Sequence, residues 1–499
     1  MKDKNAIINI FFELRMSAFD CSFDQMKEET PVKPSELLAK RFPHQPTTGQ
    51  QAFFEVMDDF LLDTERYRDC SVLKGYAGTG KTTIVSTLIK VSSKFGFKAI
   101  LLAPTGRAAK VMTSYSKKVA QTIHKKIYKQ VADAYTGNLQ FERQKNYHEN
   151  ALFIVDEASM ITNDSEFGSR GLLFDLIEFV FENVGNKLIL VGDTAQLPPV
   201  GKDLSPALDK SYLETSFYMT VFEQELTEVM RQEEGSGILT NATALRNILS
   251  QEKPQIKMQT RGFRDFFKMT GDRLEDGLRY AYHKYGRENV IIITRSNKSA
   301  VQYNQYVRRQ INAAEDELDT GDMLMIVRNN YTTIEETSPA GFLANGDFVE
   351  IKRIGRSEEI HGFRFVTLEL QLVDYEDQPP FEAKVLLDTL SSASPSLSSD
   401  DNKKLYESVM IDYQHLKSRK DRSEAVRKDP YLNALQVKFA YALTCHKSQG
   451  GQWPAVFIDQ GFLPDDQLNK EFIRWLYTAV TRATHEVFLM NFHSQFFGA

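Results

Sequence analysis

Short apolar runs rich in β-branched residues recur along the first half of the chain, and each ends in a polar or glycine-containing loop. Helical patterns lie between the runs, for example from Thr82 to Val91. Strands that are apolar on both faces and alternate with helices are typical of a parallel sheet covered on both sides. The runs that predict this sheet are SVLKG (71–75), AILLAPTG (99–106), ALFIVDEAS (151–159) and KLILVGDTAQ (187–196).

A second set of such runs follows in the C-terminal half, so two α/β domains of similar type are predicted. Between these runs, residues 320–435 alternate apolar and polar positions with turn signals, which is typical of antiparallel strands. We expect them to form a small β-barrel inserted into the second α/β domain. The runs of the second set are NVIIITRSN (289–297), FAYALTCHKSQG (439–450), AVFIDQ (455–460) and EVFLMN (486–491).

Two smaller segments have patterns of their own. Residues 127–150 contain a Thr-Gly-Asn turn between Tyr135 and Leu139, flanked by polar and aromatic residues, which predicts an exposed β-hairpin. Residues 391–404 are low in complexity, and mobility is expected there. The charged stretch after them has apolar residues at helical spacing, which indicates either a protruding helical hairpin or a solvated helix without function.

Bulk properties narrow the class of protein. A chain of 499 residues is expected to form about two to four domains, and no apolar run approaches the ~20 residues of a membrane span. The apolar N-terminal patch precedes Glu13 and Asp20 without a small-residue cleavage site, which favours a strand or helix over a signal peptide. Cys21, Cys70 and Cys445 lie far apart, so no disulfide framework is implied and a reducing cytoplasm is expected. The net charge of −6 means that a polyanion would have to be held by a local groove.

The segment GYAGTGKT matches the phosphate-binding pattern G-x-x-x-x-G-K-[ST], follows an apolar run and opens a helical pattern. Glycines let successive amides turn toward a polyphosphate, Lys81 reaches the β- and γ-oxygens, and the Thr82 hydroxyl binds Mg²⁺. A glycine-rich turn without a ligand would not require that strand and helix. The chain is therefore predicted to bind ATP and Mg²⁺ through Gly75, Ala77, Gly78, Thr79, Gly80, Lys81, Thr82 and Thr83.

Two further strand ends carry polar groups suited to hydrolysis. Asp156 and Glu157 follow four apolar residues, at the edge where ligands bind in open α/β sheets. Asp156 is predicted to hold Mg²⁺ through water, and Glu157 to orient and deprotonate the attacking water. Gln196, after the next strand, suits a γ-phosphate sensor, because an amide donates to phosphate and accepts from water. A polar cap on a Pro-Pro turn is the alternative for Gln196.

The pair Cys445–His446 has three interpretations: a metal corner, a thiol nucleophile with its base, or neither. No second Cys or His lies at ligand spacing from the pair. Cys445 is therefore predicted to be a small residue that ends a buried strand.

Seven segments together resemble the motifs of superfamily 1 helicases in order and character. The details are similar to superfamily 1B, the 5′→3′ branch of RecD-like and Dda-like proteins, and the resemblance covers residues 45–499. The segments are GYAGTGKTT, APTGRAAKVM, VDEASM, GDTAQLPPVG, LTEVMRQ, ALTCHKSQGGQW and YTAVTRA.

The resemblance implies roles for particular residues. PTTGQQAFF is similar to the Q-motif of that branch, which makes Gln50 the adenine reader. The catalytic residues would be Lys81, Glu157 and Gln196 together with two arginine fingers, Arg231 and Arg482. Arg482 would reach the site from the opposite domain. Gly450, with Lys447 and Gln449, would lie near the nucleotide. The residues implied to contact DNA are Pro104, Thr105, Arg107, His124, Thr444, His446 and Ser448, and for His124 a buried structural role stays open.

The expected fold is thus two RecA-like P-loop domains, with a pin-like hairpin in the first and a small Src-homology-3-type β-barrel in the second. The expected divisions are an extension (1–44), domain 1A (45–235, pin 127–150), domain 2A (236–319 and 436–499) and barrel domain 2B (320–435, insertion 391–430).

The implied activity is ATP-driven movement on single-stranded DNA, 5′→3′, with unwinding at junctions between single and double strands. The chain is expected to act as a monomer and without a membrane. Nuclease partners are not expected, since no cluster of acidic residues with lysine resembles a nuclease motif. Two alternatives remain: an RNA-directed helicase of the same superfamily, or a nucleotide-regulated clamp without motor activity.

Overall fold

The first domain is built on a six-stranded parallel sheet. The structure is a computed structural model, and it describes residues 32–63, 65–132, 139–163, 170–229, 235–251, 254–335, 338, 340–375, 377–464 and 468–497. The strand order is β3-β2-β6-β7-β1-β8. The strands are β1 (Asp69–Gly75), β2 (Lys98–Ala103), β3 (Ala120–Thr122), β6 (Ala151–Val155), β7 (Lys187–Gly192) and β8 (Thr220–Leu226).

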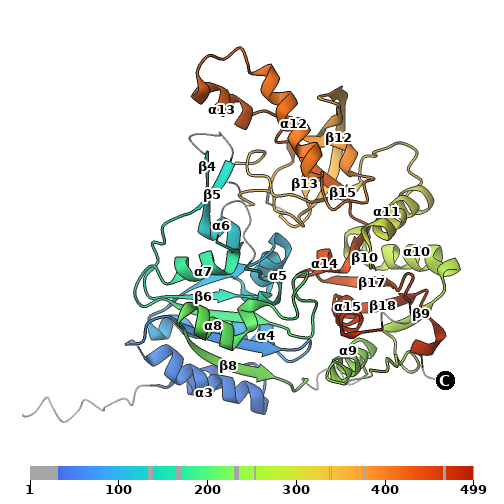
Figure 1. Ribbon diagram of the computed structural model, residues 1–499. Coiled ribbons are helices and arrows are strands. Elements are labelled where there is room, and N and C mark those ends of the chain that lie inside the picture. Colours follow the sequence, from blue (N-terminus) through green and yellow to red (C-terminus); the bar gives the residue numbers. More distant parts are fainter. Residues whose placement is uncertain are drawn as a thin grey trace, which may run out of the picture.

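Helices cover both faces of this sheet, as the continuous apolar runs predicted (Figure 1). On β6, Phe153 and Val155 face a core with α7 (Leu172–Val180) and α8 (Lys210–Phe217). Leu152 and Ile154 face the opposite core, with α2 (Pro34–Arg41), α3 (Thr48–Leu62) and α4 (Lys81–Val91). Successive side chains of a strand point to opposite faces, so each run supplies two cores at once.

The second domain has a five-stranded parallel sheet in the order β16-β10-β17-β18-β9. Its strands are β9 (Phe266–Met269), β10 (Val290–Thr294), β16 (Ala442–Thr444), β17 (Trp453–Asp459) and β18 (Ala483–Met490). The helices around it are α9 (Gly237–Ile248), α10 (Leu274–Tyr285), α11 (Asn297–Tyr306), α14 (Cys445–Ser448) and α15 (Lys470–Val480).

The segment between β10 and β16 forms a closed barrel, in agreement with the predicted insertion. Its strands are β11 (Met323–Ile326), β12 (Phe348–Ile360), β13 (Phe363–Leu372), β14 (Phe381–Leu386) and β15 (Leu435–Phe439). One continuous hydrophobic core joins the barrel to the second sheet. Barrel and second domain are therefore packed as a single unit.

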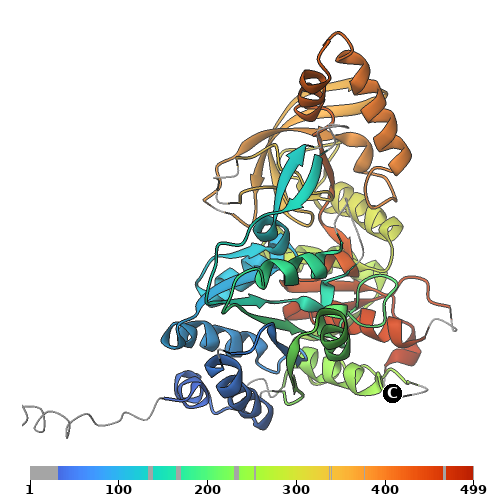
Figure 2. The same cartoon turned by 60° about the vertical axis from the view of Figure 1, so that its left-hand side comes forward.

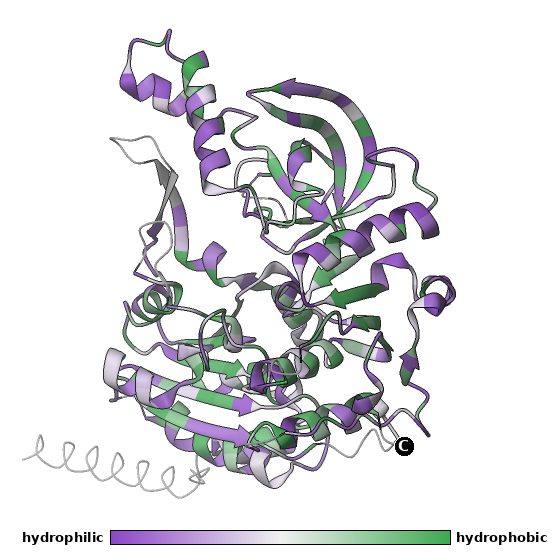
Figure 3. Ribbon diagram, turned by 45° about the vertical axis from the view of Figure 1, so that its right-hand side comes forward, coloured by the Kyte–Doolittle hydropathy of each residue, from purple (hydrophilic) through white to green (hydrophobic). Residues whose placement is uncertain are grey.

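One seam of the barrel differs from the antiparallel expectation. β15 pairs antiparallel with β11 but parallel with β14. A parallel neighbour requires a crossover connection, and here it contains α12 (Ser399–Asp412) and α13 (Arg419–Arg427). These two helices form the predicted helical hairpin, which projects from the barrel and consists largely of hydrophilic residues (Figure 3).

Part of the low-complexity segment forms the start of α12 instead of a loop. The Ser398 hydroxyl accepts a hydrogen bond from the backbone N–H of Asp401 at 3.1 Å, and Asp400 and Asp401 lie in the first turn. Such caps and acidic first turns stabilise a helix N-terminus. Leu405 and Val409 then pack against Phe365 of β13.

The predicted β-hairpin is present in the first domain. β4 (Tyr128–Ala132) pairs antiparallel with β5 (Leu139–Arg143), and the pair rises on the side of the molecule where the barrel lies (Figures 1 and 2). Its turn, residues 133–138, lies outside the described residues, as does the apolar N-terminal patch. None of the helices in the described part of the chain combines the length and apolar character of a membrane span.

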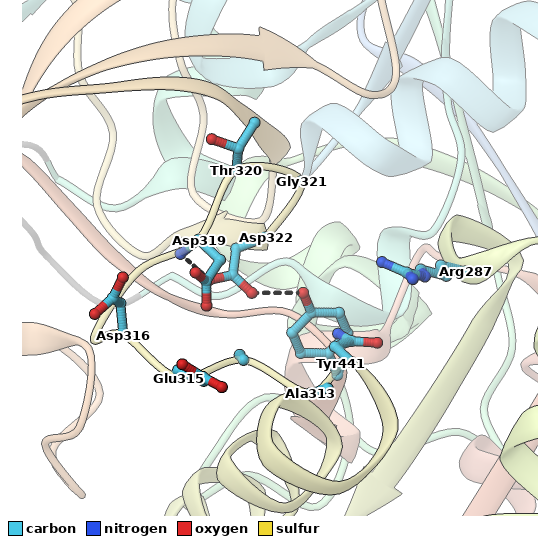
Figure 4. A pocket seen from close by; sticks show the side chains of 11 residues that line it. Arg287, Ala313, Glu315, Asp316, Asp319, Thr320, Gly321, Asp322 and Tyr441 are labelled. Carbon is cyan, nitrogen blue, oxygen red and sulfur yellow. Dashed lines mark hydrogen bonds between the residues drawn. The ribbon is translucent and has the colours of Figure 1, made fainter.

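Acidic side chains gather where the chain passes from the second domain into the barrel, and Figure 4 shows Asp319 and Asp322 there beside Tyr441. The Arg308 guanidinium donates from Nε to both carboxylate oxygens of Asp322 at 3.0 Å. Tyr441, where the chain returns from the barrel, donates its hydroxyl to Asp322 at 2.9 Å. Both partners of the ion pair are nearly buried, with side-chain exposures of 9% for Arg308 and 3% for Asp322.

We expect Asp322→Ala to destabilise this junction, because it leaves the Arg308 cation buried without its main partner. The expected loss is about 3 kcal/mol in urea denaturation of the barrel and second domain. Glu275→Ala is the matched control, since Glu275 pairs with Arg279 at the surface, where such pairs contribute about 0.5 kcal/mol. Equal losses in the two variants would contradict the prediction.

Candidate nucleotide site and nucleic-acid groove

The phosphate-binding loop lies between β1 and α4, as predicted. Gly78 and Gly80 have φ angles of 77° and 84°, in the left-handed region that favours glycine, and Gly80 precedes the first residue of α4. The Lys81 ammonium donates to the carbonyls of Gly75 at 2.7 Å and Tyr76 at 3.0 Å, so it lies against its own loop. A cation beside a helix N-terminus in a glycine-rich turn suits a polyphosphate.

Gln50 supports this loop from behind. Its side chain is fully buried, its Oε1 accepts from the Thr47 backbone N–H at 3.0 Å, and its Nε2 donates to the Thr79 carbonyl at 2.9 Å. The predicted adenine contact stays a prediction, and both polar ends of the amide are engaged within the protein. Gln50 therefore links α3 to the phosphate-binding loop.

The two acidic residues after β6 have different environments. Asp156 accepts hydrogen bonds from the Glu157 backbone N–H at 2.8 Å and from the Tyr115 hydroxyl at 2.7 Å. Glu157 has a φ of 53°, which is strained for a residue other than glycine and is often found at functional sites. Burial raises the pKa of Glu157, and the positive charge of nearby Arg482 opposes the shift. A carboxylate with a raised pKa suits a general base.

Arg482 reaches this site from the second domain. It is 3% exposed, donates from Nε to the Thr478 carbonyl at 3.1 Å, and its Nη1 lies 3.8 Å from Glu157 Oε1. The other predicted finger, Arg231, lies outside the described residues. Arg482 thus completes a cluster to which both domains contribute.

Gln196 follows β7 at the same edge of the sheet. It is 6% exposed, and its Oε1 is buried without a hydrogen-bond partner among the described residues. A buried acceptor without a donor is costly, so an orphan oxygen of this kind fits a site that receives a ligand or water. This geometry agrees with the proposed role as acceptor from the attacking water.

Several residues predicted to contact DNA meet in one cavity of about 290 Å³, although they are far apart in the sequence. The first domain contributes Pro104, Thr105 and His124, and the second contributes His446. Burial lowers the pKa of His124, which favours its neutral form, and its ring lies against Tyr128. The barrel closes the cavity with Asn329, Phe342 and Asn345.

Arg107 and Ser448 differ from this prediction. The Arg107 guanidinium lies between two aromatic rings, 4.5 Å from the centroid of Phe348 and 4.2 Å from that of Trp453. Ser448 is fully buried, and its hydroxyl donates to the Cys445 carbonyl at 2.8 Å. Both side chains are engaged inside the protein: the first domain, the barrel and the second domain meet at Arg107, and Ser448 is bonded within α14, of which it is the last residue. Thr444 is the N-cap residue of α14.

Cys445 is the buried residue that the sequence predicted. It is 1% exposed, its thiol donates to the Trp475 carbonyl at 3.4 Å, and burial raises its pKa to about 12. A thiol with this pKa stays protonated at neutral pH and is a poor nucleophile. Gly450, with a φ of 73°, forms the turn after α14 and lies against Thr105 and Ala108.

Comparisons with known proteins cover both domains. A family described as "AAA domain" matches residues 55–261, and one described as "UvrD-like helicase C-terminal domain" matches residues 439–490. The ATP-dependent DNA helicase dda of Enterobacteria phage T4 is 26% identical over 471 residues, which are 89% of this chain and 98% of that protein. Uncharacterized protein R530 of Acanthamoeba polyphaga mimivirus is 24% identical over 494 residues, with coverages of 84% and 94%.

A third relative matches over a shorter range. The ATP-dependent RecD2 DNA helicase of Deinococcus radiodurans is 34% identical over 136 residues, which are 27% of this chain and 16% of that protein. A nucleotide-binding first domain, a helicase-type C-terminal region and likeness along nearly the whole chain agree with the order of motifs. These likenesses support a helicase of superfamily 1B.

The resemblance implied that Lys447 lies near the nucleotide. The structure places it instead in the cavity lined by Thr105, His124 and His446, which we call the groove. The Nζ atom is buried, and no described residue hydrogen-bonds to it. Burial lowers the pKa of Lys447 to about 8. A buried ammonium without an acceptor in the groove is suited to bind a phosphate oxygen.

The structure therefore predicts a pH-dependent contribution of Lys447 to binding of single-stranded DNA. Phosphate binds the ammonium form, and the free protein loses this proton as the pH rises through about 8. Affinity should fall from pH 7 to pH 9.5, and Lys447→Met should weaken binding ~10-fold at pH 7 but much less at pH 9.5.

Fluorescence anisotropy at constant ionic strength measures both affinities. Lys94→Met removes an exposed lysine of the first domain, on the 3₁₀ turn Ser92–Phe95, and is the charge-matched control. An equal loss at pH 7 and pH 9.5 in Lys447→Met would contradict the assignment.

Proposed function

We propose that this superfamily 1B helicase is an ATP-driven motor that moves 5′→3′ on single-stranded DNA and unwinds duplexes. One observation carries the proposal: both α/β domains contribute to the nucleotide site and also to the groove. Arg482 of the second domain lies 3.8 Å from Glu157 of the first, and His446 lines a cavity with Thr105. Movement between the domains would thus change both sites together.

Two residues fit the Mg²⁺ that accompanies ATP in such sites. Mg²⁺ is bound there through one or two protein oxygens together with substrate phosphates. Thr82, at the start of α4, and Asp156, at the end of β6, offer a hydroxyl and a carboxylate. When bound, the ion would neutralise developing charge on the phosphates.

The remaining chemistry is assigned to side chains of this chain. Glu157, whose pKa burial raises, accepts the proton of the attacking water, and Gln196 Oε1 orients that water. Lys81 and Arg482 stabilise negative charge on the transferred phosphoryl group. Because Arg482 belongs to the second domain, hydrolysis depends on closure of the cleft.

Arg482→Ala tests this part of the proposal. Nucleotide binding should persist, because the phosphate-binding loop stays intact, while DNA-stimulated turnover should fall ~10³-fold, the size of an arginine-finger effect. Steady-state ATPase assays and binding of a fluorescent ATP analogue separate the two quantities. Arg279→Ala on α10 is the control, since Arg279 is exposed and pairs only with nearby groups. Turnover of Arg482→Ala near the wild-type rate would remove this residue from the site.

Strand-displacement assays test substrate and polarity. Duplexes with a 5′ or a 3′ single-stranded tail, built from DNA or RNA, are incubated with ATP. We expect unwinding of 5′-tailed DNA. DNA as the substrate follows the relative named as a DNA helicase, of which the match covers 98%, and the 5′ tail follows the resemblance to the 5′→3′ branch. Unwinding of 3′-tailed substrates alone would reverse the polarity, and unwinding of RNA alone would favour the RNA-directed alternative.

Lys81→Ala provides the control for motor activity in the same assay. Loss of the cation that faces the phosphates should abolish unwinding and DNA-stimulated turnover. Turnover unchanged in this variant would leave the nucleotide-regulated clamp as the better explanation.

A further inference from the structure

The loop after β7, residues 193–197, is held by the second domain although it belongs to the first. We name this segment the coupling loop. The Leu197 backbone N–H donates to the Thr478 hydroxyl at 2.8 Å, and the Leu197 carbonyl accepts from Gln449 Nε2 at 2.8 Å. Ala195 and Leu197 pack in the core of the second domain and barrel, with exposures of 1% and 2%. The coupling loop is therefore expected to move together with the second domain.

Tyr477 joins the coupling loop to the phosphate-binding loop. It lies on α15 of the second domain and is 1% exposed. Its hydroxyl accepts from the Ala77 backbone N–H at 2.8 Å and donates to Asp193 Oδ2 at 2.7 Å. Burial, followed by the negative charge of Asp193, raises the pKa of Tyr477 well above its usual value, so the hydroxyl stays a donor.

Asp193 carries this contact to Gln196. Asp193 is 1% exposed, its second carboxylate oxygen accepts from the Ala195 backbone N–H at 2.9 Å, and its carbonyl accepts from the Gln196 backbone N–H at 3.3 Å. The carboxylate therefore folds the loop that carries Gln196. Without the Tyr477 hydroxyl, Asp193 would lose a charge-assisted hydrogen bond in a buried place.

The other end of the coupling loop meets the groove. Gln449, which bonds to Leu197, lines the cavity together with Lys447 and His446. A single five-residue segment thus contacts the phosphate-binding loop through Tyr477 and the nucleic-acid groove through Gln449.

We propose that Tyr477 is a positioning residue that couples the nucleotide state to the grip on single-stranded DNA. When α15 moves relative to the first domain, the hydroxyl must leave Ala77, and the coupling loop, which is bonded to Tyr477 and Thr478, moves with α15. The orientation of Gln196 and the shape of the groove then change in one step. Because coupling between two binding sites is reciprocal, DNA should change the affinity for the nucleotide through the same contact. The inference rests on the proposed function and adds the residue that links its two sites.

Tyr477→Phe tests the inference, because it removes the hydroxyl and keeps the buried ring. The dissociation constant of a fluorescent oligodeoxythymidine is measured with and without AMP-PNP and Mg²⁺. We expect the ratio of the two constants to differ from one in the wild-type protein and to move toward one in the variant. DNA-stimulated kcat should fall ~10-fold, as expected for one lost hydrogen bond to a charged group. The KM for ATP should change less than kcat.

Tyr282→Phe is the matched control. Tyr282 lies on α10 of the same domain, its pKa is also raised by burial, and its hydroxyl forms no hydrogen bond with any described residue. A purely structural effect of Tyr477→Phe would lower thermal stability but leave the ratio of dissociation constants unchanged. A ratio and a stimulated kcat within twofold of the wild-type values would overturn the inference.

A second pair of variants decides the matter if Tyr477→Phe fails to fold. Thr478→Val keeps the shape of the side chain but removes the acceptor for the Leu197 backbone N–H. It should shift the ratio in the same direction, and Thr478→Ser should restore it. If neither effect on the ratio is observed, the inference is overturned. If DNA does not stimulate ATP turnover by the wild-type protein, the proposed function itself is overturned.

Discussion

In a parallel sheet all strands end at the same edge, and polar ligands bind there because the loops and helix N-termini beyond that edge present backbone amides. In this helicase the edge of the first sheet carries the phosphate-binding loop, Glu157 and Gln196, and residues of the second domain meet it. Arg482 lies between α15 and β18, and His446 lies on α14, after β16. Each site is completed only when the second domain is in place against this edge. The function of the chain therefore depends on how the two domains are joined.

The cores show where movement can occur. The first domain has two main cores of its own, one on each face of its sheet, whereas the barrel and the second domain share one. Arg107 bridges the division, because this residue of the first domain lies between an aromatic ring of the barrel and one of the second domain. A cation–π contact tolerates sliding better than a directional hydrogen bond, so it suits a surface between moving parts. The coupling loop crosses the same division with directional bonds.

Prediction from the sequence succeeded where the chemistry is local. The turn of the phosphate-binding loop, the carboxylates after β6 and the buried Cys445 after β16 all follow from residues adjacent in the chain. The parallel pairing of β15 with β14, which closes the barrel, did not follow from adjacent residues. The helices α12 and α13 separate the two strands in the sequence, and no local pattern marks the pairing. The strands β8 and β9 were also missed. In β8 only Val221 and Leu226 are buried, and β9 has only four residues.

The sequence by itself determined the two α/β domains, the inserted barrel and the nucleotide-binding residues, since strand patterns and glycine-rich turns depend on short-range sterics. Tertiary structure decided which polar groups face the groove: it placed Lys447 there and turned Arg107 and Ser448 inward. It also decided that the Tyr477 hydroxyl meets Ala77, a residue 400 positions away. No spacing rule connects two such residues, because their contact exists only once both domains have folded and packed against each other.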